Sequence, residues 1–364
     1  MAHDILFTPL QVGNTELQNR ILMAPLTRLR ATEPDDIPSP LAAEYYAQRA
    51  SAGLIITEAT QVSYQAKGYA GAPGLHTDEQ QAAWTEIVQA VHARGGKIAV
   101  QLWHTGLVSH QSLQPGGQAP ISASAAAIDA RTSLRDEQGR TIRAATSPAR
   151  AASLADIQQV IADYAAATAR ARAAGFDFIE IHGAHGYLLS QFWAAAINQR
   201  QDEYGGSREN RARLMLNVLD ACISAWDRQH VGIRLSPLGA FNSVDFGYEE
   251  EDSLWLMAQI NQRAPAFLHL SEPDWAGGLP YSQHFRQRIR QTFNGPIFAA
   301  GAYDATKAEQ LIGEHLIDAA AFGRAYIANP DLPERIAQNA PLNAVDNATT
   351  YGGGAAGYTD YPSP

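Results

Sequence analysis

Residues 154–182 read LADIQQVIADYAAATARARAAGFDFIEIH, an amphipathic stretch that runs directly into a short apolar one. Ile157, Val160 and Tyr164 recur at helical spacing, and Ser153 with Asp156 has the form of a capping box at a helix start. The run 177–182 is rich in Phe and Ile and has the length of a strand. This segment therefore predicts one helix followed by one buried strand.

The same alternation extends along the chain. Helical patterns occupy 79–94, 154–174, 208–227, 250–262, 282–293 and 304–314. Short β-rich runs occupy 20–25, 53–57, 97–102, 177–182, 231–236, 266–271, 296–300 and 317–323. Eight alternations predict an α/β protein folded as a single (β/α)₈ TIM barrel, one domain over residues 1–364.

One connection is much longer than the others. Residues 106–152 follow the third strand and are rich in Gln, Ser, Gly, Pro and Ala. A connection of this length inside a compact fold is usually functional, and in a barrel it would rise from the catalytic face. We interpret it as a lid on that face; a neutral surface insertion is the alternative.

Composition limits the partners. The 364 residues carry a formal net charge of −10 and no basic run, which argues against nucleic acid and anionic membranes. Cys222 is the only cysteine, so an internal disulfide is excluded, and its helical spacing with Val218 favours core packing. The sequence has neither a signal-peptide pattern nor an apolar run of membrane-spanning length. A cytoplasmic protein is expected.

The last two predicted strands end in small residues. Gly301 and Ala302 follow the seventh strand, and Gly323 and Arg324 follow the eighth. This corner of a barrel commonly binds phosphate, through open backbone N–H groups and a guanidinium. Glycines that only make turns are the alternative, and the phosphate could belong to a sugar or to a cofactor.

The fourth predicted strand ends in His182-Gly-Ala-His185-Gly-Tyr187. Two imidazoles that bind one oxygen, with a phenol that supplies a proton, form a carbonyl-polarising site. Core histidines are one alternative. A metal site is another, but no further His or Cys segment appears to complete it, and we expect none.

The chain resembles the Old Yellow Enzyme family of FMN-dependent ene reductases, especially its bacterial branch of N-ethylmaleimide and nitrate-ester reductases. The resemblance spans nearly the whole chain. It rests on Phe7–Leu10, Asn19-Arg20, Met23–Arg28, Gly53–Thr60, Gln101–His104, His182–Leu189, Asn198–Arg213, Phe322–Arg324 and Tyr358–Pro362.

The resemblance implies a role for each matching residue. His182 and His185 would bind the activating oxygen of the substrate, and Tyr187 would protonate its α-carbon. FMN would be held by Pro25, Thr27, Ala59, Gln101, Arg234, Gly301, Ala302, Gly323 and Arg324. The substrate pocket would be lined by Tyr69, Trp103, Asn242, Pro273 and Tyr351.

The implied activity is reduction of electron-poor alkenes (enones, enals, maleimides, nitroalkenes), extending to nitrate esters and nitroaromatics. NADPH or NADH would reduce FMN, flavin N5 would deliver hydride, and Tyr187 would supply the proton. A monomer or a homodimer fits equally. The alternatives are a flavin-binding sink or sensor without turnover, and a cofactor-free aldolase or isomerase acting on a phosphorylated substrate. The latter needs a lysine or carboxylate at a strand end, and neither Lys67 nor Lys97 fits well.

Several positions depart from the family pattern. Trp193 and Ile197 follow the histidine motif where relatives carry smaller, more polar residues and a proline, and Leu107 replaces a common arginine. Asn242 and Pro273 differ from the usual Gln and Thr. We expect Trp193 and Ile197 to narrow the pocket or to displace the chain beside it; filling of the adjoining core is the alternative. The arginines of 106–152 could meet a nucleotide phosphate or lie in solvent.

Overall fold

The computed structural model describes residues 3–241, 244–245 and 249–363. Its centre is a closed barrel of eight parallel strands, in the order β10-β11-β14-β15-β16-β3-β4-β5. All eight predicted strands are confirmed. Their bounds are β3 Ile21–Met23, β4 Ile55–Gln61, β5 Ile98–Trp103, β10 Phe178–His182, β11 Val231–Leu235, β14 Phe267–Ser271, β15 Ile297–Ala300 and β16 Ala319–Phe322.

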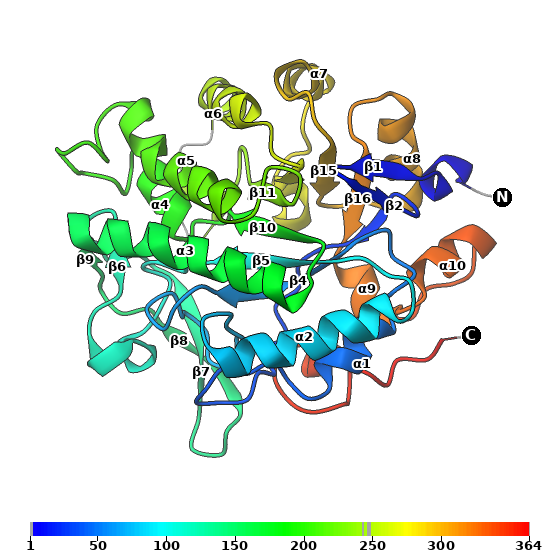
Figure 1. Cartoon of the computed structure of the whole chain (residues 1–364), viewed down its shortest axis with the longest axis horizontal. Helices are drawn as coiled ribbons and strands as arrows, with labels where there is room; N and C mark the ends of the chain where they lie inside the picture. Colours follow the sequence, from blue (N-terminus) through cyan, green and yellow to red (C-terminus); the bar gives the residue numbers. More distant parts are fainter. Residues whose placement is uncertain (1–2, 242–243, 246–248, 364) are drawn as a thin grey trace.

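Helices surround the barrel (Figure 1). The six predicted helices are α2 Asp78–His92, α3 Leu154–Ala174, α5 Arg208–Ala225, α6 Glu250–Arg263, α7 Gln283–Thr292 and α8 Ala305–Gly313. Shorter helices are α1 Ala42–Ala47, α4 Leu188–Trp193, α9 Arg324–Ala328 and α10 Leu332–Gln338. Turns of 3₁₀-helix are η1 Asp4–Phe7, η2 Gln111–Leu113, η3 Pro115–Gly117, η4 Pro273–Ala276 and η5 Asn347–Thr349. The predicted capping box of Ser153 and Asp156 starts α3. Within the described ranges, no helix has the length and apolarity needed to cross a membrane.

The barrel interior has an apolar layer below a polar one. Alternate residues of a strand point inward. Those nearer the amino ends of the strands form an apolar cluster that includes Leu54, Phe178, Phe267 and Phe298. Gly232 completes this packing, since a Cβ there would overlap the Phe267 ring. Nearer the carboxyl ends of the strands, the buried side chains become polar: Gln101, Glu180, His182, Arg234, His269 and Ser271. Polar chemistry is thus confined to one mouth of the barrel.

An N-terminal hairpin closes the opposite end. β1 Leu10–Val12 pairs antiparallel with β2 Thr15–Leu17. Leu10, Val12 and Leu17 join the same apolar cluster as the lower barrel residues. The hairpin therefore acts as a plug beneath the barrel.

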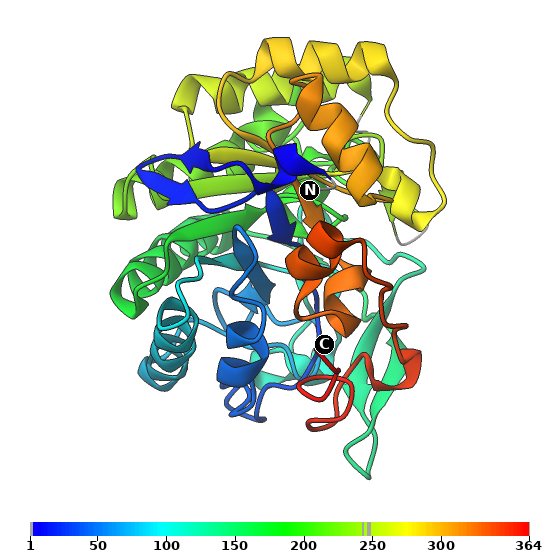
Figure 2. The same ribbon diagram turned by 90° about the vertical axis from the view of Figure 1, so that its right-hand side faces the viewer.

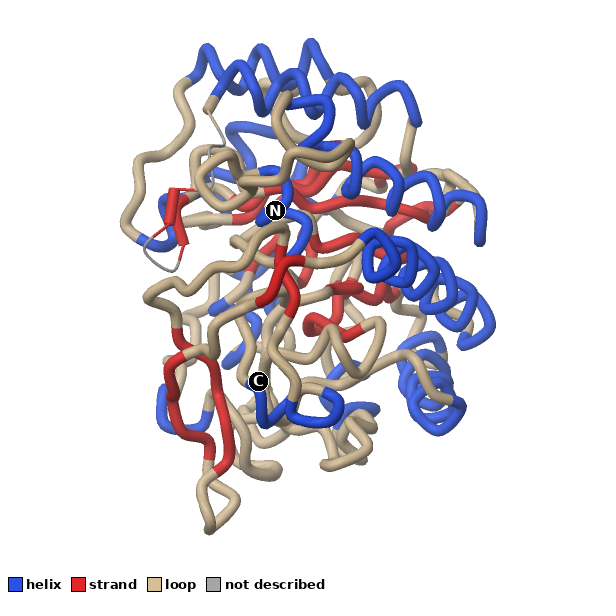
Figure 3. The backbone as a smooth tube through the Cα atoms, turned by 90° about the vertical axis from the view of Figure 1, so that its left-hand side faces the viewer, coloured by secondary structure: helices blue, strands red, loops and turns tan. Residues whose placement is uncertain are grey.

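The segment 106–152 leaves the carboxyl end of β5 and projects from the body of the molecule (Figures 1 and 3). It contains the antiparallel hairpin β7 Arg131–Arg135 and β8 Thr141–Ala145. Its base is a parallel pair, β6 Ile121–Ser122 with β9 Arg150–Ala151. The hairpin binds the mouth through Ala70 N–H, which donates to Ser133 O at 2.8 Å, and through Arg135, which donates to Leu29 O at 2.8 Å. Its role as a lid, and the single-domain interpretation, stay predictions.

Candidate active site

His182 is the last residue of β10, and a tight turn carries His185 and Tyr187 back over it. The turn requires positive φ at His185 (59°) and Gly186 (75°). The His182 ring lies 5.3 Å from that of His185 and 5.0 Å from that of Tyr187, measured between centroids. The three side chains thus meet at one point of the mouth, as the motif predicts.

Hydrogen bonds orient both histidines, and burial determines their charge. The backbone N–H of Ala184 donates to His182 Nδ1 at 3.2 Å, so the ring proton of neutral His182 is on Nε2. His185 Nε2 lies 2.7 Å from Ser271 Oγ, and its backbone N–H donates to Ser236 Oγ. Burial, followed by the charge of Arg234, holds both histidine pKa values well below 6.5. Both rings are therefore neutral near pH 7.

Tyr187 belongs to an aromatic wall. Its hydroxyl lies 3.0 Å from that of Tyr69. The Trp103 ring stacks on Tyr69 at 5.4 Å and meets Tyr187 edge-on at 4.7 Å. Burial, with Tyr69 beside it, raises the pKa of Tyr187 well above 10. Tyr187 thus stays protonated over the physiological range and can act as a proton donor.

Tyr351 and Arg143 approach this wall from two other segments. Both affect the pKa values of Tyr69 and Tyr187 through their charges, Arg143 lowering them and Tyr351 raising them. Arg143 belongs to β8 and also donates to Ser133 Oγ. Tyr351 lies in the C-terminal tail and is 56% exposed. The tail and the hairpin therefore reach the mouth.

The other arginines of 106–152 differ in their contacts. Arg140 pairs with Asp136 inside the hairpin, and Arg135 is held by Glu33, Leu29 O and Thr141. Arg131 is exposed. Arg150 pairs with Asp156 at the start of α3. Of these five arginines, Arg143 is the one whose charge acts on the pKa values of Tyr69 and Tyr187.

The residues expected beside a flavin ring also line the mouth. Ala59 follows a β-bulge in β4, where the register with β5 shifts between Ile56 and Ala59. It packs in a cluster with Trp103 and Leu29. Pro25 and Thr27 are partly buried just beyond β3, and Gln101 and Arg234 are buried. The bulge re-aims the chain at Ala59, as bulges next to active sites often do.

Unpaired polar atoms test whether these residues fit a flavin. Within the part of the chain that the structure describes, Arg234 Nε, Trp103 Nε1 and His269 Nε2 are buried without a hydrogen-bond partner. Buried donors and acceptors of this kind are rare in native proteins. A planar ligand with several polar edge atoms, such as an isoalloxazine ring, would give such groups partners. The residues present therefore fit the group.

The phosphate corner contains a residue that the sequence did not indicate. The N–H of Ala302 donates to Asp274 Oδ1 at 2.9 Å, and Lys307 Nζ binds Asp274 Oδ2 at 2.8 Å. The Ala302 donor predicted for a phosphate is thus already engaged. At Gly323 a Cβ would meet only Leu26, at 3.4 Å, and Arg324 is exposed. Gly323 and Arg324 remain open to a phosphate.

The predicted pocket walls are only partly placed. Pro273 is buried at the start of η4, close to the ends of the barrel strands. Asn242 lies outside the described residues.

Trp193 and Ile197 have contacts away from the mouth. The Trp193 ring stacks on Trp255 of α6 at 6.1 Å, and its carbonyl accepts a hydrogen bond from Arg211 of α5. Ile197 is buried in the main core, as is Leu107. These contacts lie in the helical layer, so they do not support the expectation that Trp193 narrows the pocket; they agree with the alternative that it fills the adjoining core.

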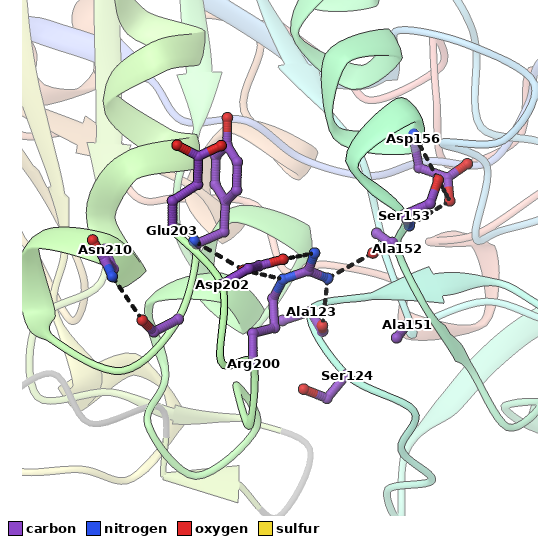
Figure 4. Close-up of polar contacts among 12 residues, drawn as sticks. Ala123, Ser124, Ala151, Ala152, Ser153, Asp156, Arg200, Asp202, Glu203 and Asn210 are labelled. Carbon is purple, nitrogen blue, oxygen red and sulfur yellow. Dashed lines mark hydrogen bonds and ion pairs between the residues drawn. The ribbon is translucent and has the colours of Figure 1, made fainter.

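A separate groove of about 670 Å³ lies between the base of 106–152 and residues 199–202. Arg200 spans it, donating to Ala123 O and Ala152 O and pairing with Asp202 (Figure 4). Since its guanidinium already has these partners, Arg200 is a structural clamp between two segments.

Neither Lys67 nor Lys97 is placed to act as the lysine of a cofactor-free aldolase or isomerase. Lys67 is paired with buried Asp36 at 2.6 Å. Lys97 precedes β5, at the opposite end of the barrel from the mouth. Among the described residues, no group of three or more His, Cys, Asp or Glu side chains could hold a metal ion.

Fold and site together define a barrel oxidoreductase of the flavin-dependent class. Residues 5–343 match the model of the NADH:flavin oxidoreductase / NADH oxidase family. The chain therefore belongs to this family, within its Old Yellow Enzyme group, and is an FMN-dependent NAD(P)H oxidoreductase.

Individual relatives agree with this assignment. The chain is 42% identical over 363 residues to 12-oxophytodienoate reductase 1 of Oryza sativa subsp. japonica, covering 98% of this chain and 92% of the relative. Morphinone reductase in complex with tetrahydroNAD has a TM-score of 0.93 and 46% identity, covering 98% and 97% of the two chains. The old yellow enzyme homologue of Zymomonas mobilis has a TM-score of 0.92 and 38% identity, with 99% of each chain covered.

Proposed function

We propose that this protein, loaded with FMN and reduced by NADPH or NADH, reduces the carbon–carbon double bond of electron-poor alkenes. Enones, enals, maleimides and nitroalkenes are the substrate classes. The observation that carries the proposal is the meeting of His182, His185 and Tyr187 against the Trp103–Tyr69 wall. Nitrate esters and nitroaromatics are further substrates, because the histidines need only an oxygen on an electron-poor group that accepts their hydrogen bonds.

The histidines polarise the substrate. His182 carries its ring proton on Nε2, because Nδ1 accepts from Ala184 N–H. A neutral imidazole that donates to a carbonyl or nitro oxygen draws electron density from the conjugated double bond and leaves its β-carbon electrophilic. Because Ser271 and Ser236 orient His185, little reorganisation is needed when a substrate arrives.

Tyr187 supplies the proton. Its hydroxyl keeps the proton near pH 7, and the neighbouring Tyr69 hydroxyl at 3.0 Å can receive or return one. Bound FMN would supply the hydride, with Thr27, Ala59, Gln101 and Arg234 at its ring and Gly323 and Arg324 at its phosphate. Trp103 and Tyr69 exclude water from the reacting face.

The test uses the purified protein under anaerobic conditions. It is expected to be yellow, to bleach with NADPH or NADH, and to regain its colour when 2-cyclohexenone is added, with cyclohexanone as the product. Saturated cyclohexanone is the matched control and should not restore colour. A protein that bleaches and is reoxidised by none of the four alkene classes would be an electron sink or sensor. A colourless protein that ignores added FMN would overturn the proposal entirely.

A further inference from the structure

A buried carboxylate lies in the polar layer, between three barrel strands. It belongs to Glu180, which precedes His182 by two residues and so points to the same side of β10. Glu180 of β10 is fully buried. It accepts from Gln101 Nε2 of β5 at 2.8 Å and from His269 Nδ1 of β14 at 2.7 Å. None of these contacts belongs to the substrate-binding trio.

The two partners of Glu180 are neutral donors. Burial lowers the pKa of His269, with Glu180 acting in the opposite direction, so the ring is neutral near pH 7. Because a carboxylate only accepts, the ring proton of His269 is on Nδ1. Among the described residues, no lysine or arginine lies within ion-pairing distance of Glu180. The carboxylate is hydrogen-bonded, and its charge is not neutralised by direct contact.

That charge acts on Arg234. Burial lowers the pKa of the Arg234 guanidinium, and Glu180 raises it. The strand register explains the proximity: Glu180 pairs with Gly232, which has no side chain, and His182 pairs with Arg234. A buried negative charge and a buried positive charge thus lie on neighbouring strands, where the low dielectric makes their fields long-ranged.

We propose that Glu180 is a positioning residue that orients the Gln101 amide and partly offsets the Arg234 cation, thereby lowering the reduction potential of the bound flavin. The proposal rests on FMN binding at this mouth. Reduction adds negative charge to the flavin; Arg234 favours that charge and Glu180 opposes it. Without Glu180, the site would favour the reduced flavin more strongly and release its electrons to an alkene less readily.

Two substitutions separate charge from position. Glu180→Gln removes the charge and keeps a hydrogen-bonding group of the same length. We expect its midpoint potential, from spectroelectrochemical titration of the holoenzyme, to rise by about 30 mV, which corresponds to a tenfold stronger preference for reduced flavin in a two-electron couple. Glu180→Asp keeps the charge but shortens the reach. It should leave the potential near that of the parent and weaken FMN binding to the apoprotein about tenfold, because Gln101 loses its acceptor.

Asp36→Asn is the matched control, since Asp36 is another buried carboxylate, and its hydrogen-bonded partners, Lys67 and Gln61, do not belong to the polar layer. It should lose stability without a change in potential. A parent-like potential in Glu180→Gln would overturn the electrostatic role, and parent-like FMN affinity in Glu180→Asp would overturn the orienting role. If Glu180→Gln does not fold, the FMN affinity of Glu180→Asp still tests the orienting role. These readouts need only bound FMN, so they stay distinct from a failure of the parent to reduce alkenes.

Discussion

At the scale of single residues, one backbone contact determines the tautomer of His182. The N–H of Ala184 holds Nδ1 and so turns the Nε2–H outward. Because burial keeps the ring neutral, its donation does not require a protonation step in the physiological range.

His182→Ala removes this donor. We expect reoxidation of the reduced enzyme by 2-cyclohexenone to slow by about 10²–10³, the usual cost of losing one donor at a developing oxyanion. Flavin content and reduction by NADPH should change much less. Stopped-flow measurement of both half-reactions checks this, with His315→Ala, at the amino end of the barrel before β16, as the control. An unchanged alkene half-reaction would show that His182 does not bind the substrate oxygen.

The sequence located only part of the site. Residues of one motif, such as His182, His185 and Tyr187, are adjacent in the chain, so their meeting was predictable. The contacts of Glu180 with His269, of His185 with Ser271 and of Ala302 with Asp274 join different strands or loops. They depend on barrel register and loop path, which residue patterns do not determine.

At the scale of elements, two arginines after β3 hold the C-terminal tail over the mouth. Fully buried Arg28 donates to Thr350 O at 3.0 Å and to Gly357 O at 2.6 Å, and its carbonyl accepts from Gly352 N–H at 2.7 Å. These bonds flank Tyr351 on both sides. Arg30 shares the Thr350 carbonyl with Arg28 and adds three more tail carbonyls, those of Thr349, Gly354 and Ala356.

Arg28→Met should release the tail while leaving the barrel folded. We expect faster proteolysis of residues 349–358 and a KM for bulky enones raised several-fold, with a smaller effect on small enones, because Tyr351 loses its fixed place. Arg335→Met is the control, since Arg335 binds Pro341 O and Pro362 O, on either side of the Tyr351 segment. Equal proteolysis of the parent and Arg28→Met would refute the clamp.

The long elements were predictable and the short ones were not. α3 and the strand β10 that follows it are recognisable from their helical and β-rich patterns, and α3 ends at Ala174 as predicted. The hairpins β1–β2 and β7–β8, with three to five residues per strand, carry no pattern that distinguishes them from loops. The side chains of Leu10 and Leu17 pack against the apolar cluster inside the barrel. This tertiary contact overrides the local preference of the segment.

At the scale of the whole molecule, one buried acid couples stability to pH. Burial raises the pKa of Glu58 to about 8, against the lowering effect of Arg28 and Arg30. The folded state therefore holds a proton that the unfolded chain releases near its ordinary pKa of about 4.3. The resulting stability is complete below that value and is lost as pH rises through about 8.

Glu58→Gln should flatten this dependence. Between pH 7 and 8 the free energy of unfolding of the parent should fall with pH, by at most about 1.4 kcal/mol per pH unit, and that of the variant should fall less. Urea unfolding at each pH measures the difference. His76 and His104, with pKa values lowered by burial to about 4 and about 3, act with the opposite sign at lower pH, so the comparison belongs above pH 7. Parallel curves for the two proteins would contradict the assignment.

The tail also bears on the order in which the protein is made. The barrel strands and the α-helices are complete once β16, α9 and α10 have emerged from the ribosome, but Tyr351 and the residues that Arg28 and Arg30 bind are synthesised afterwards. In a nascent chain still tethered at its carboxyl end, the residues expected beside a flavin can thus take their places before the tail, drawn in red in Figure 2, packs against Arg28 and Arg30. FMN that bound during translation would then meet a mouth without the tail, whereas substrate meets the released enzyme with the tail in place.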